Sequence, residues 1–340
     1  MVNKNQKSPP LRGEISPQAE KIKNQKLRIR IGKIMLENPV IAASGTFGYG
    51  EEMKEFYDIN KLGAVVTKTT TLKPRDGNPM PRVVETPSGM LNSIGLENEG
   101  LEDFILNKIP FLEKLKTNVI VSIAGNSIDE FKQLTEELSK LRCISAIELN
   151  LSCPNIVPAC PAGRHRPSSI VHRLIAQDKL ATRKVVQSAR KRTRLTLITK
   201  LSPNVTDIRE IAKAAEDAGT DAISLINTVF GMSVNIKTKR SNLGSRHGGL
   251  SGPAVKPIAL NLVREAYQAV KIPIIGMGGI FTAEDALEFI ICGSTAIQVG
   301  TANFVNPEVA IDVIDGIAGY MRRNKIRNIN SLIGSLVASS

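Results

Sequence analysis

Several residue types and sequence patterns are scarce in this chain, and each scarcity excludes a class of protein. The 340 residues include no tryptophan, three histidines and four cysteines. Four cysteines in a chain of this length do not make the disulfide framework of a small secreted domain, so we expect reduced thiols. Because histidines are few and no Ser-His-Asp arrangement is evident, we do not expect catalysis by histidine.

Long apolar segments and targeting signals are also lacking. No run approaches the roughly 20 apolar residues that a membrane-spanning helix needs. The basic amino terminus lacks the apolar core of a secretory signal. A Walker-type GxxxxGK[ST] motif is missing, which argues against nucleotide hydrolysis. We therefore expect a soluble, cytoplasmic protein with no membrane partner.

The spacing of cysteine and histidine gives no support to a metal site. Cys153, Cys160, His165 and His172 supply two thiols and two imidazoles, but their spacing matches neither zinc ribbons nor zinc fingers. Iron-sulfur ligation within the chain is equally unsupported. The sequence predicts no metal site.

Positive charge is abundant but uneven. The formal net charge is +13. Residues 1–33 hold nine lysines and arginines against two glutamates, and residues 160–194 hold ten against one aspartate. The remainder is slightly acidic, so an evenly basic nucleic-acid-binding body is not indicated. Two interpretations stay open for the basic segments: solvated surface, or contact with an acidic partner or RNA.

Short β-branched segments alternate with amphipathic ones from about residue 28, a pattern typical of βα units around a parallel sheet. Eight apolar segments have the character of buried strands: 39–43, 64–67, 119–123, 146–151, 195–201, 222–226, 272–275 and 295–299. Helical patterns occur at 101–115, 127–141, 179–191, 205–218, 254–270, 282–291 and 307–323. Eight strands predict an α/β fold, the (β/α)8 TIM barrel, rather than an open doubly wound sheet, whose dinucleotide glycine spacing is missing.

We expect one barrel domain over residues 28–325, with a flexible basic extension at 1–27 and a carboxyl-terminal tail at 326–340. Two connections, 69–99 and 154–177, are longer than a βα turn requires, and long loops tend to be functional or disordered. Both follow predicted strands. They should therefore lie over the carboxyl-end face, where barrel enzymes place their active sites.

Polar and glycine residues end the predicted strands, and these ends should meet at one mouth. Any one of them could be a cap or a turn residue, but seven strands share the feature. The residues are Ser44-Gly45, Lys68-Thr69, Asn150 with the Cys153 loop, Lys200, Asn227-Thr228, Gly276-Met-Gly-Gly279 and Gly300-Thr301.

These strand ends predict three kinds of chemistry. Lys68 and Lys200 end apolar runs, and two lysines directed into one cleft indicate an anionic ligand. The glycines after the seventh and eighth strands lie where barrel enzymes often hold a phosphate with backbone N–H groups. Cys153 is a candidate acid-base residue or nucleophile, whereas Cys143 and Cys292 are expected to be structural.

Longer motifs make the pattern specific. They are ASGTFGYG (43–50), GNPMPRVVETPSGMLNSIGLENEG (77–100), ELNLSCPN (148–155), KLSPNVTDI (200–208), INTVFGM (226–232), GGLSGPAVKP (248–257), PIIGMGGI (273–280) and VGTANF (299–304). From about residue 31 to residue 306 the chain resembles the dihydroorotate dehydrogenases of class 1, and more narrowly the 1B catalytic subunit.

The resemblance implies an FMN-binding barrel that oxidises (S)-dihydroorotate to orotate in pyrimidine synthesis, with Cys153 as the base. The substrate contacts that it implies are Lys68, Asn92, Ser93, Ile94, Gly95, Leu96, Asn150, Asn155, Asn227 and Thr228. The FMN contacts that it implies are Ser44, Lys68, Thr69, Asn150, Lys200, Ile226, Gly252, Gly278, Gly279, Gly300 and Thr301. It further implies a homodimer of barrels and an electron-transfer subunit with FAD and a [2Fe-2S] cluster, which passes electrons to NAD.

Three features depart from the family pattern. Ser122 stands where an asparagine is common, the segment 156–173 is longer and more basic than the usual loop over the substrate, and residues 1–27 have no counterpart. Two alternatives therefore stay open. One is a flavoenzyme similar to tRNA-dihydrouridine synthase, which the basic segments would suit, and the other is a non-catalytic barrel relative.

Overall fold

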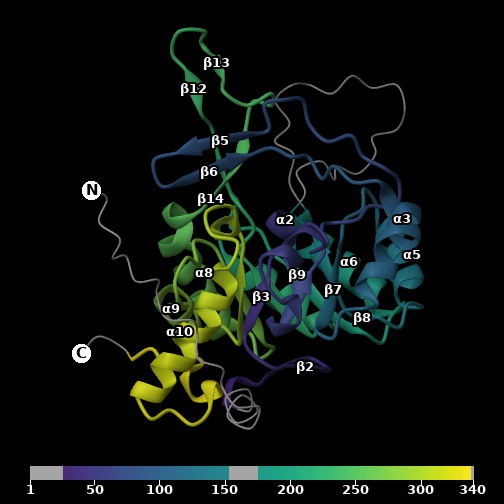
Figure 1. The fold of residues 1–340 in the computed structure, drawn as a ribbon. Coiled ribbons are helices and arrows are strands. Elements are labelled where there is room, and N and C mark those ends of the chain that lie inside the picture. The colour runs from purple at the N-terminus through teal and green to yellow at the C-terminus, as the bar shows by residue number, and fades with distance from the viewer. Residues whose placement is uncertain (1–25, 153–174, 338–340) are drawn as a thin grey trace, which may run out of the picture.

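A closed barrel of eight parallel strands forms the centre of the molecule (Figure 1). The computed structural model describes residues 26–152 and 175–337. The barrel strands are β3 (Val40–Ala42), β4 (Ala64–Val66), β7 (Asn118–Ile123), β8 (Ile144–Asn150), β9 (Thr196–Lys200), β10 (Ala222–Leu225), β15 (Ile274–Met277) and β16 (Ala296–Val299). Every predicted strand is present, and the prediction of a (β/α)8 barrel is confirmed.

Helices surround the barrel and cover the outer faces of its strands (Figure 1). They are α5 (Ile128–Leu138), α6 (Lys179–Arg190), α7 (Ile208–Asp217), α8 (Lys256–Ala269), α9 (Ala283–Cys292) and α10 (Val309–Arg323). The first residue of a helix differs from the prediction where a side chain caps the helix N-terminus. Helix α7 begins at Ile208 rather than near Val205, because the Asp207 side chain accepts the Arg209 N–H and ends the preceding loop.

The predicted helix 101–115 is broken into three parts. A π-helical segment, Phe104–Lys108, separates α3 (Gly100–Asp103) from α4 (Ile109–Leu112). Pro110 follows this segment and has no N–H to continue the regular helical ladder. The Ile109 N–H reaches back to the Phe104 carbonyl, which is the wide turn of a π-helix.

A second sheet lies over the carboxyl-end face of the barrel (Figure 1). Its antiparallel strands, in spatial order, are β11 (Val229–Gly231), β14 (Gly248–Ser251), β6 (Gly89–Asn92) and β5 (Val83–Thr86). Strands β5 and β6 belong to the connection 69–99, and β11 and β14 follow β10. The connection 69–99 therefore lies over the mouth as predicted, but it carries a hairpin that the sequence pattern did not reveal.

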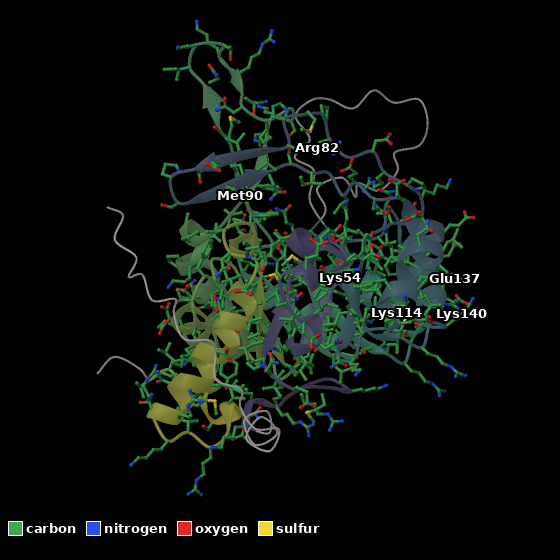
Figure 2. All side chains as sticks on the ribbon, viewed as in Figure 1. Lys54, Arg82, Met90, Lys114, Glu137 and Lys140 are labelled. Atoms are coloured by element: carbon green, nitrogen blue, oxygen red, sulfur yellow. The ribbon has the colours of Figure 1, made fainter. Side chains whose placement is uncertain are left out.

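Smaller hairpins lie at both ends of the molecule (Figure 1). Strands β12 (Val234–Asn235) and β13 (Arg240–Ser241) project beyond the second sheet. Strands β1 (Ile29–Ile31) and β2 (Ile34–Leu36) lie at the opposite end and bury Ile29, Ile31 and Leu36. The short helix α2 (Ser44–Phe47) follows β3 at the mouth. Figure 2 shows Met90 in the second sheet and Arg82 just before β5, both well above Glu137 and Lys140 beside the barrel.

The residues after α10 pack on the barrel as far as they are described. Ile329 is fully buried, and the N–H groups of Gly334 and Leu336 donate to the carbonyls of Ile290 and Ile291 at 3.0 and 3.1 Å. Within the described ranges, none of the helices is long and apolar enough to cross a membrane.

The amino-terminal end of α9 should contribute to stability in a pH-dependent way. Thr282 and Asp285 form a capping box, and Lys256 Nζ lies 2.6 Å from Asp285 Oδ1. Burial alone would raise the pKa of the Asp285 carboxyl, but hydrogen bonds from Lys256 and from the Phe281 and Thr282 N–H groups outweigh it and lower the pKa. A lowered carboxyl pKa means that the contribution is present at neutral pH and is lost as the pH falls below about 4.

Replacing Asp285→Asn should lower the free energy of unfolding by about 1 kcal/mol at pH 7, measured in urea. The difference from wild type should shrink as the pH falls towards 3. Glu284→Gln, in the same helical turn, is the control and should change much less. A deficit for Asp285→Asn that is constant between pH 7 and pH 3 would contradict the assignment.

Candidate functional site: the mouth of the barrel

A chain of side-chain hydrogen bonds crosses the mouth and connects four barrel strands or the residues just after them. Asn227 Nδ2 donates to Asn150 Oδ1 at 3.4 Å, and Asn150 Nδ2 donates to Thr69 Oγ1 at 3.3 Å. The Thr69 hydroxyl lies 3.0 Å from that of Ser122, which takes the position where asparagine was expected. The structure therefore brings together three of the predicted site residues and keeps Ser122 buried beneath them.

The second sheet brings Asn92 and Thr228 to the same region. Asn92 pairs with Gly249 across β6 and β14, and its side chain donates to the Gly249 carbonyl at 3.3 Å. A β-carbon at Gly249 would lie 2.0 Å from Thr228 Oγ1, so only glycine admits the Thr228 side chain here. Asn204, which sequence reasoning missed, donates to the Thr228 carbonyl at 3.2 Å.

The predicted substrate loop 93–96 is held by a buried asparagine. Gly95 and Leu96 both have positive φ angles, 78° and 58°. Asn98 Nδ2 donates to the Leu96 carbonyl at 2.8 Å, and its Oδ1 accepts the N–H groups of Thr71 and Gly100. Only 4% of Asn98 is exposed. Asn98 therefore fixes the loop against the residues that follow β4, and sequence reasoning missed it.

The predicted glycine turns meet at one corner of the mouth. A β-carbon at Gly279 would lie 2.8 Å from the Gly252 carbonyl oxygen, and one at Gly278 would lie 3.4 Å from Ile226. Thr301 Oγ1 donates to Ser251 Oγ at 2.8 Å. Three separate connections thus converge, and the missing side chains let their backbones pack closely together.

The turn after β3 joins this corner. Thr46 Oγ1 donates to the Gly300 carbonyl at 3.0 Å, which places the adjacent Ser44-Gly45 turn beside Gly300. A β-carbon at Gly45 would meet no atom within 4 Å, so open space adjoins the turn. Ser44 itself is buried.

Lys200 lies at the inner end of the mouth, opposite Asn150 in the pairing of β8 with β9. It is 6% exposed, and its Nζ lies 3.8 Å from Oε1 of Glu148, which is fully buried. Ser224 Oγ and Gln298 Nε2 donate to the other carboxylate oxygen at 2.9 and 3.2 Å. Sequence reasoning missed Glu148, Ser224 and Gln298, although a single glutamate within an apolar strand was a usable signal.

Lys68, the second predicted lysine, borders the substrate loop. Its N–H donates to the Gly48 carbonyl at 2.7 Å. The pKa of the Glu97 carboxyl, just after the loop, is lowered chiefly by its hydrogen bond and ion pair with Arg82 and additionally by the charge of Lys68. Lys68 is only partly buried, and its ammonium group is therefore available to an anion at the mouth.

Cys153 and Asn155, the predicted base and one predicted substrate contact, lie outside the described residues. So does the altered basic loop 156–173. The described strand β8 ends at Asn150 and leads directly into this segment. The roles predicted for these residues therefore depend on the sequence motif alone.

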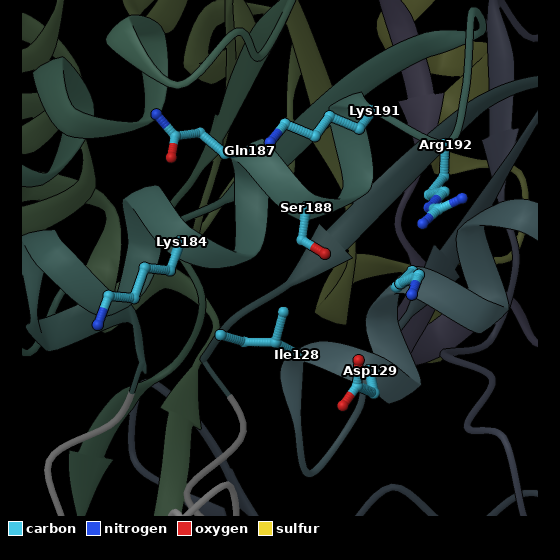
Figure 3. Close-up of a pocket in the computed structure, with 8 residues that line it drawn as sticks. Ile128, Asp129, Lys184, Gln187, Ser188, Lys191 and Arg192 are labelled. Carbon is cyan, nitrogen blue, oxygen red and sulfur yellow. The ribbon is translucent and has the colours of Figure 1, made fainter.

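A separate basic groove lies on the outside of the barrel, between α5 and α6 (Figure 3). It encloses about 370 Å³ and is lined by Ile128, Asp129, Lys132, Lys184, Gln187, Ser188, Lys191 and Arg192. No predicted site residue lines it. Part of the positive charge noted at 160–194 is thus directed to the outer surface and not to the mouth.

The fold and the mouth define a (β/α)8-barrel enzyme with buried amides, two lysines and a glycine corner suited to an anionic ligand and a phosphate group. Comparison with known proteins narrows this class. The family model described as "Dihydroorotate dehydrogenase" matches residues 26–321. The chain belongs to the dihydroorotate dehydrogenase family.

Individual relatives support the same family membership. The chain is 50% identical over 309 residues to the "Dihydroorotate dehydrogenase B (NAD(+)), catalytic subunit" of Desulforamulus reducens, covering 91% of this chain and 98% of the relative. The proteins of the same name from Geotalea uraniireducens and Bacteroides thetaiotaomicron are 47% and 46% identical over 311 and 310 residues. These two comparisons cover 92% and 91% of this chain and 98% of each relative.

Proposed function

We propose that this chain is the catalytic subunit of an NAD-linked dihydroorotate dehydrogenase, which oxidises (S)-dihydroorotate to orotate in pyrimidine biosynthesis with FMN as its cofactor. The observation that carries the proposal is the convergence of Asn150, Asn227, Lys200 and the glycine corner at one barrel mouth. Family membership favours this activity over the formation of dihydrouridine in tRNA.

The residues present fit FMN. Gly45 borders open space, and a β-carbon at Gly300 would meet only Ala43, at 3.7 Å, so these two turns leave room for a phosphate. Gly252, Gly278 and Gly279 let the neighbouring turns pack against one another. Lys200 offers an ammonium group at the inner end of the mouth, and within the described part of the chain it has no hydrogen-bond partner. The buried Ser93 hydroxyl likewise has no partner among these residues and is free for a ligand. We assign FMN to Ser44, Lys68, Thr69, Asn150, Lys200, Ile226, Gly252, Gly278, Gly279, Gly300 and Thr301.

The amides suit dihydroorotate. Asparagine donates to carboxylate and carbonyl oxygens and accepts from ring N–H groups. Asn92, Asn150, Asn155 and Asn227 could therefore hold the substrate ring by its oxygens and its N–H groups. Thr228 and the loop 93–96 would complete the site, and Lys68 would face the substrate carboxylate.

The chemistry requires loss of a proton and a hydride from adjacent substrate carbons. When bound, FMN supplies the hydride acceptor. Cys153, as thiolate, would take the proton from substrate C5. Lys200 would stabilise the negative charge that the flavin gains on reduction, in the manner of an oxyanion hole. The amides would orient the ring so that base and acceptor address opposite faces.

The NAD-linked reaction implies a second subunit. The relatives are catalytic subunits by name. We propose an electron-transfer subunit with FAD and a [2Fe-2S] cluster as the partner, and a homodimer of barrels as the core of the assembly. The purified chain should contain FMN and form orotate with an artificial electron acceptor, while NAD should serve only when the second subunit is present. Protein that contains FMN but forms no orotate would refute the proposal.

Asn98 should affect substrate binding without touching the ligand. Asn98→Ala removes the bonds that hold the Leu96 carbonyl and the Thr71 and Gly100 N–H groups. We expect the KM for dihydroorotate to rise about tenfold, because releasing the loop leaves buried polar groups unpaired at about 1–3 kcal/mol. FMN content should not change. Asn242→Ala, which removes a side-chain bond to Ser233 in the distant β12–β13 hairpin, should leave the KM unaltered. An unchanged KM for Asn98→Ala would exclude this role.

A further inference from the structure

A buried cluster inside the barrel unites groups from four strands beneath the mouth. Glu148 belongs to β8, Lys200 to β9, Ser224 to β10 and Gln298 to β16. Glu148, Ser224 and Gln298 are at most 1% exposed, and Lys200 is 6% exposed. Glu148 and Asn150 are two residues apart on one strand, so their side chains share the face that points into the barrel.

Burying the Glu148 carboxylate inside the barrel costs free energy, so its position calls for a physical reason. Removing a carboxylate from water costs several kcal/mol, which a close counter-ion and hydrogen bonds must offset. Oε2 receives two hydrogen bonds, at 2.9 and 3.2 Å, whereas Oε1 has none among the described residues and faces Lys200 Nζ at 3.8 Å. At this distance the two groups attract each other electrostatically, but the ammonium N–H donors stay available to a ligand above.

Packing does not require this pair. Other positions on this inner face are apolar: Ile198 pairs with Glu148, and Ile275 pairs with Ser224. Both are fully buried, so the barrel accommodates hydrocarbon side chains at this level. A hydrophobic pair of similar volume would serve stability as well or better. The pair is better explained by what it does to charge at the mouth.

We propose that Glu148 is a positioning and charge-setting residue for Lys200: it holds the ammonium group at the inner end of the mouth and cancels its charge there, which sets the reduction potential of the bound flavin. The proposal depends on the proposed function, because it assumes that FMN lies against Lys200. With Glu148 present, the buried pair is neutral as a whole. Without it, one uncompensated positive charge would favour the more negatively charged reduced flavin.

The test is the midpoint potential of the FMN-loaded protein, measured by anaerobic equilibration with a reference dye. Glu148→Gln keeps the shape and should shift the equilibrium between oxidised and reduced flavin about tenfold towards the reduced form, a rise of about 30 mV for a two-electron couple. Lys200→Met should shift it in the opposite direction, and the double variant should return close to wild type. Glu137→Gln, which removes the same charge from the surface pair with Lys140, is the matched control and should not shift it.

The outcomes separate the proposal from its alternatives. An unchanged or lowered midpoint potential in Glu148→Gln would overturn the charge-setting role. So would a double variant whose midpoint potential differs from wild type as much as that of Lys200→Met alone. Should Glu148→Gln fail to retain FMN, the double variant, which contains no unpaired buried charge, must fold and retain it; failure of both would also overturn the role. If the wild-type protein binds no FMN, the proposed function itself fails. If the wild-type protein is an active dehydrogenase and Glu148→Gln has the wild-type midpoint potential, only this inference is refuted.

Discussion

Replacing Cys153→Ser will slow the reduction of bound FMN by dihydroorotate about 10²- to 10⁴-fold, the usual contribution of a general base. A serine hydroxyl holds its proton far more tightly than a thiol does, so it accepts the substrate proton poorly at neutral pH. FMN content should stay at the wild-type level, because Cys153 is assigned to the substrate and not to the cofactor. Rapid mixing under anaerobic conditions, with flavin absorbance as the signal, measures the rate directly.

Cys143→Ser is the matched control for this change. Cys143 lies just before the first residue of β8, at the end of the strand opposite the mouth. Burial and the charge of Glu113 raise the pKa of its thiol, which keeps it protonated and unreactive. Its replacement should leave flavin reduction unaffected. Equal rates for Cys153→Ser and wild type would refute the base assignment.

Replacing Lys200→Met will have the second large effect, and it should appear in stability as well as in catalysis. The change leaves Glu148 buried without its counter-ion, which costs about 3–5 kcal/mol in comparable buried pairs. It also removes the ammonium N–H donors that we place against the flavin, so flavin reduction should slow by about 10²-fold or more. Urea unfolding and anaerobic stopped-flow mixing measure the two effects separately.

The double variant Lys200→Met with Glu148→Gln distinguishes the two contributions. Removing the unpaired carboxylate should restore most of the free energy of unfolding, because the remaining groups are neutral. The midpoint potential should return with the stability, but the rate of flavin reduction should stay low, because the ammonium N–H donors are still missing. Recovery of the rate together with the stability would mean that Lys200 acts only as a structural partner of Glu148.

The barrel could be predicted from the sequence because its strands are buried on both faces. Segments such as Val119–Ile123 and Ala222–Ile226 are short apolar runs, and their order with intervening helices leaves few alternatives. Positions at strand ends, such as Asn150 and Lys200, followed from the same argument. The structure brings them together as expected.

The second sheet could not be predicted in this way. Strands β6 and β14 contain Gly89, Gly248 and Gly249, and glycine is depleted in ordinary strands. These strands pair over long sequence separations, and no local pattern encodes such pairing. Gly249 is required because Thr228 occupies the space of a side chain, and that is a tertiary constraint.

The buried cluster was missed for a different reason. The predicted site residues were those at the ends of strands, whereas Glu148 lies two residues before the end of β8. Its partners Ser224 and Gln298 come from strands remote in the sequence. Alternation along β8 does place Glu148 on the face of Asn150, so the signal was present although its partners could not be identified.

Anaerobic mixing of the oxidised, FMN-loaded protein with (S)-dihydroorotate, in the absence of NAD, tests the central claim most directly. The account predicts that the flavin absorbance bleaches in a single fast phase and that one orotate forms for each flavin reduced. A flavin that stays oxidised in the presence of saturating dihydroorotate would contradict it.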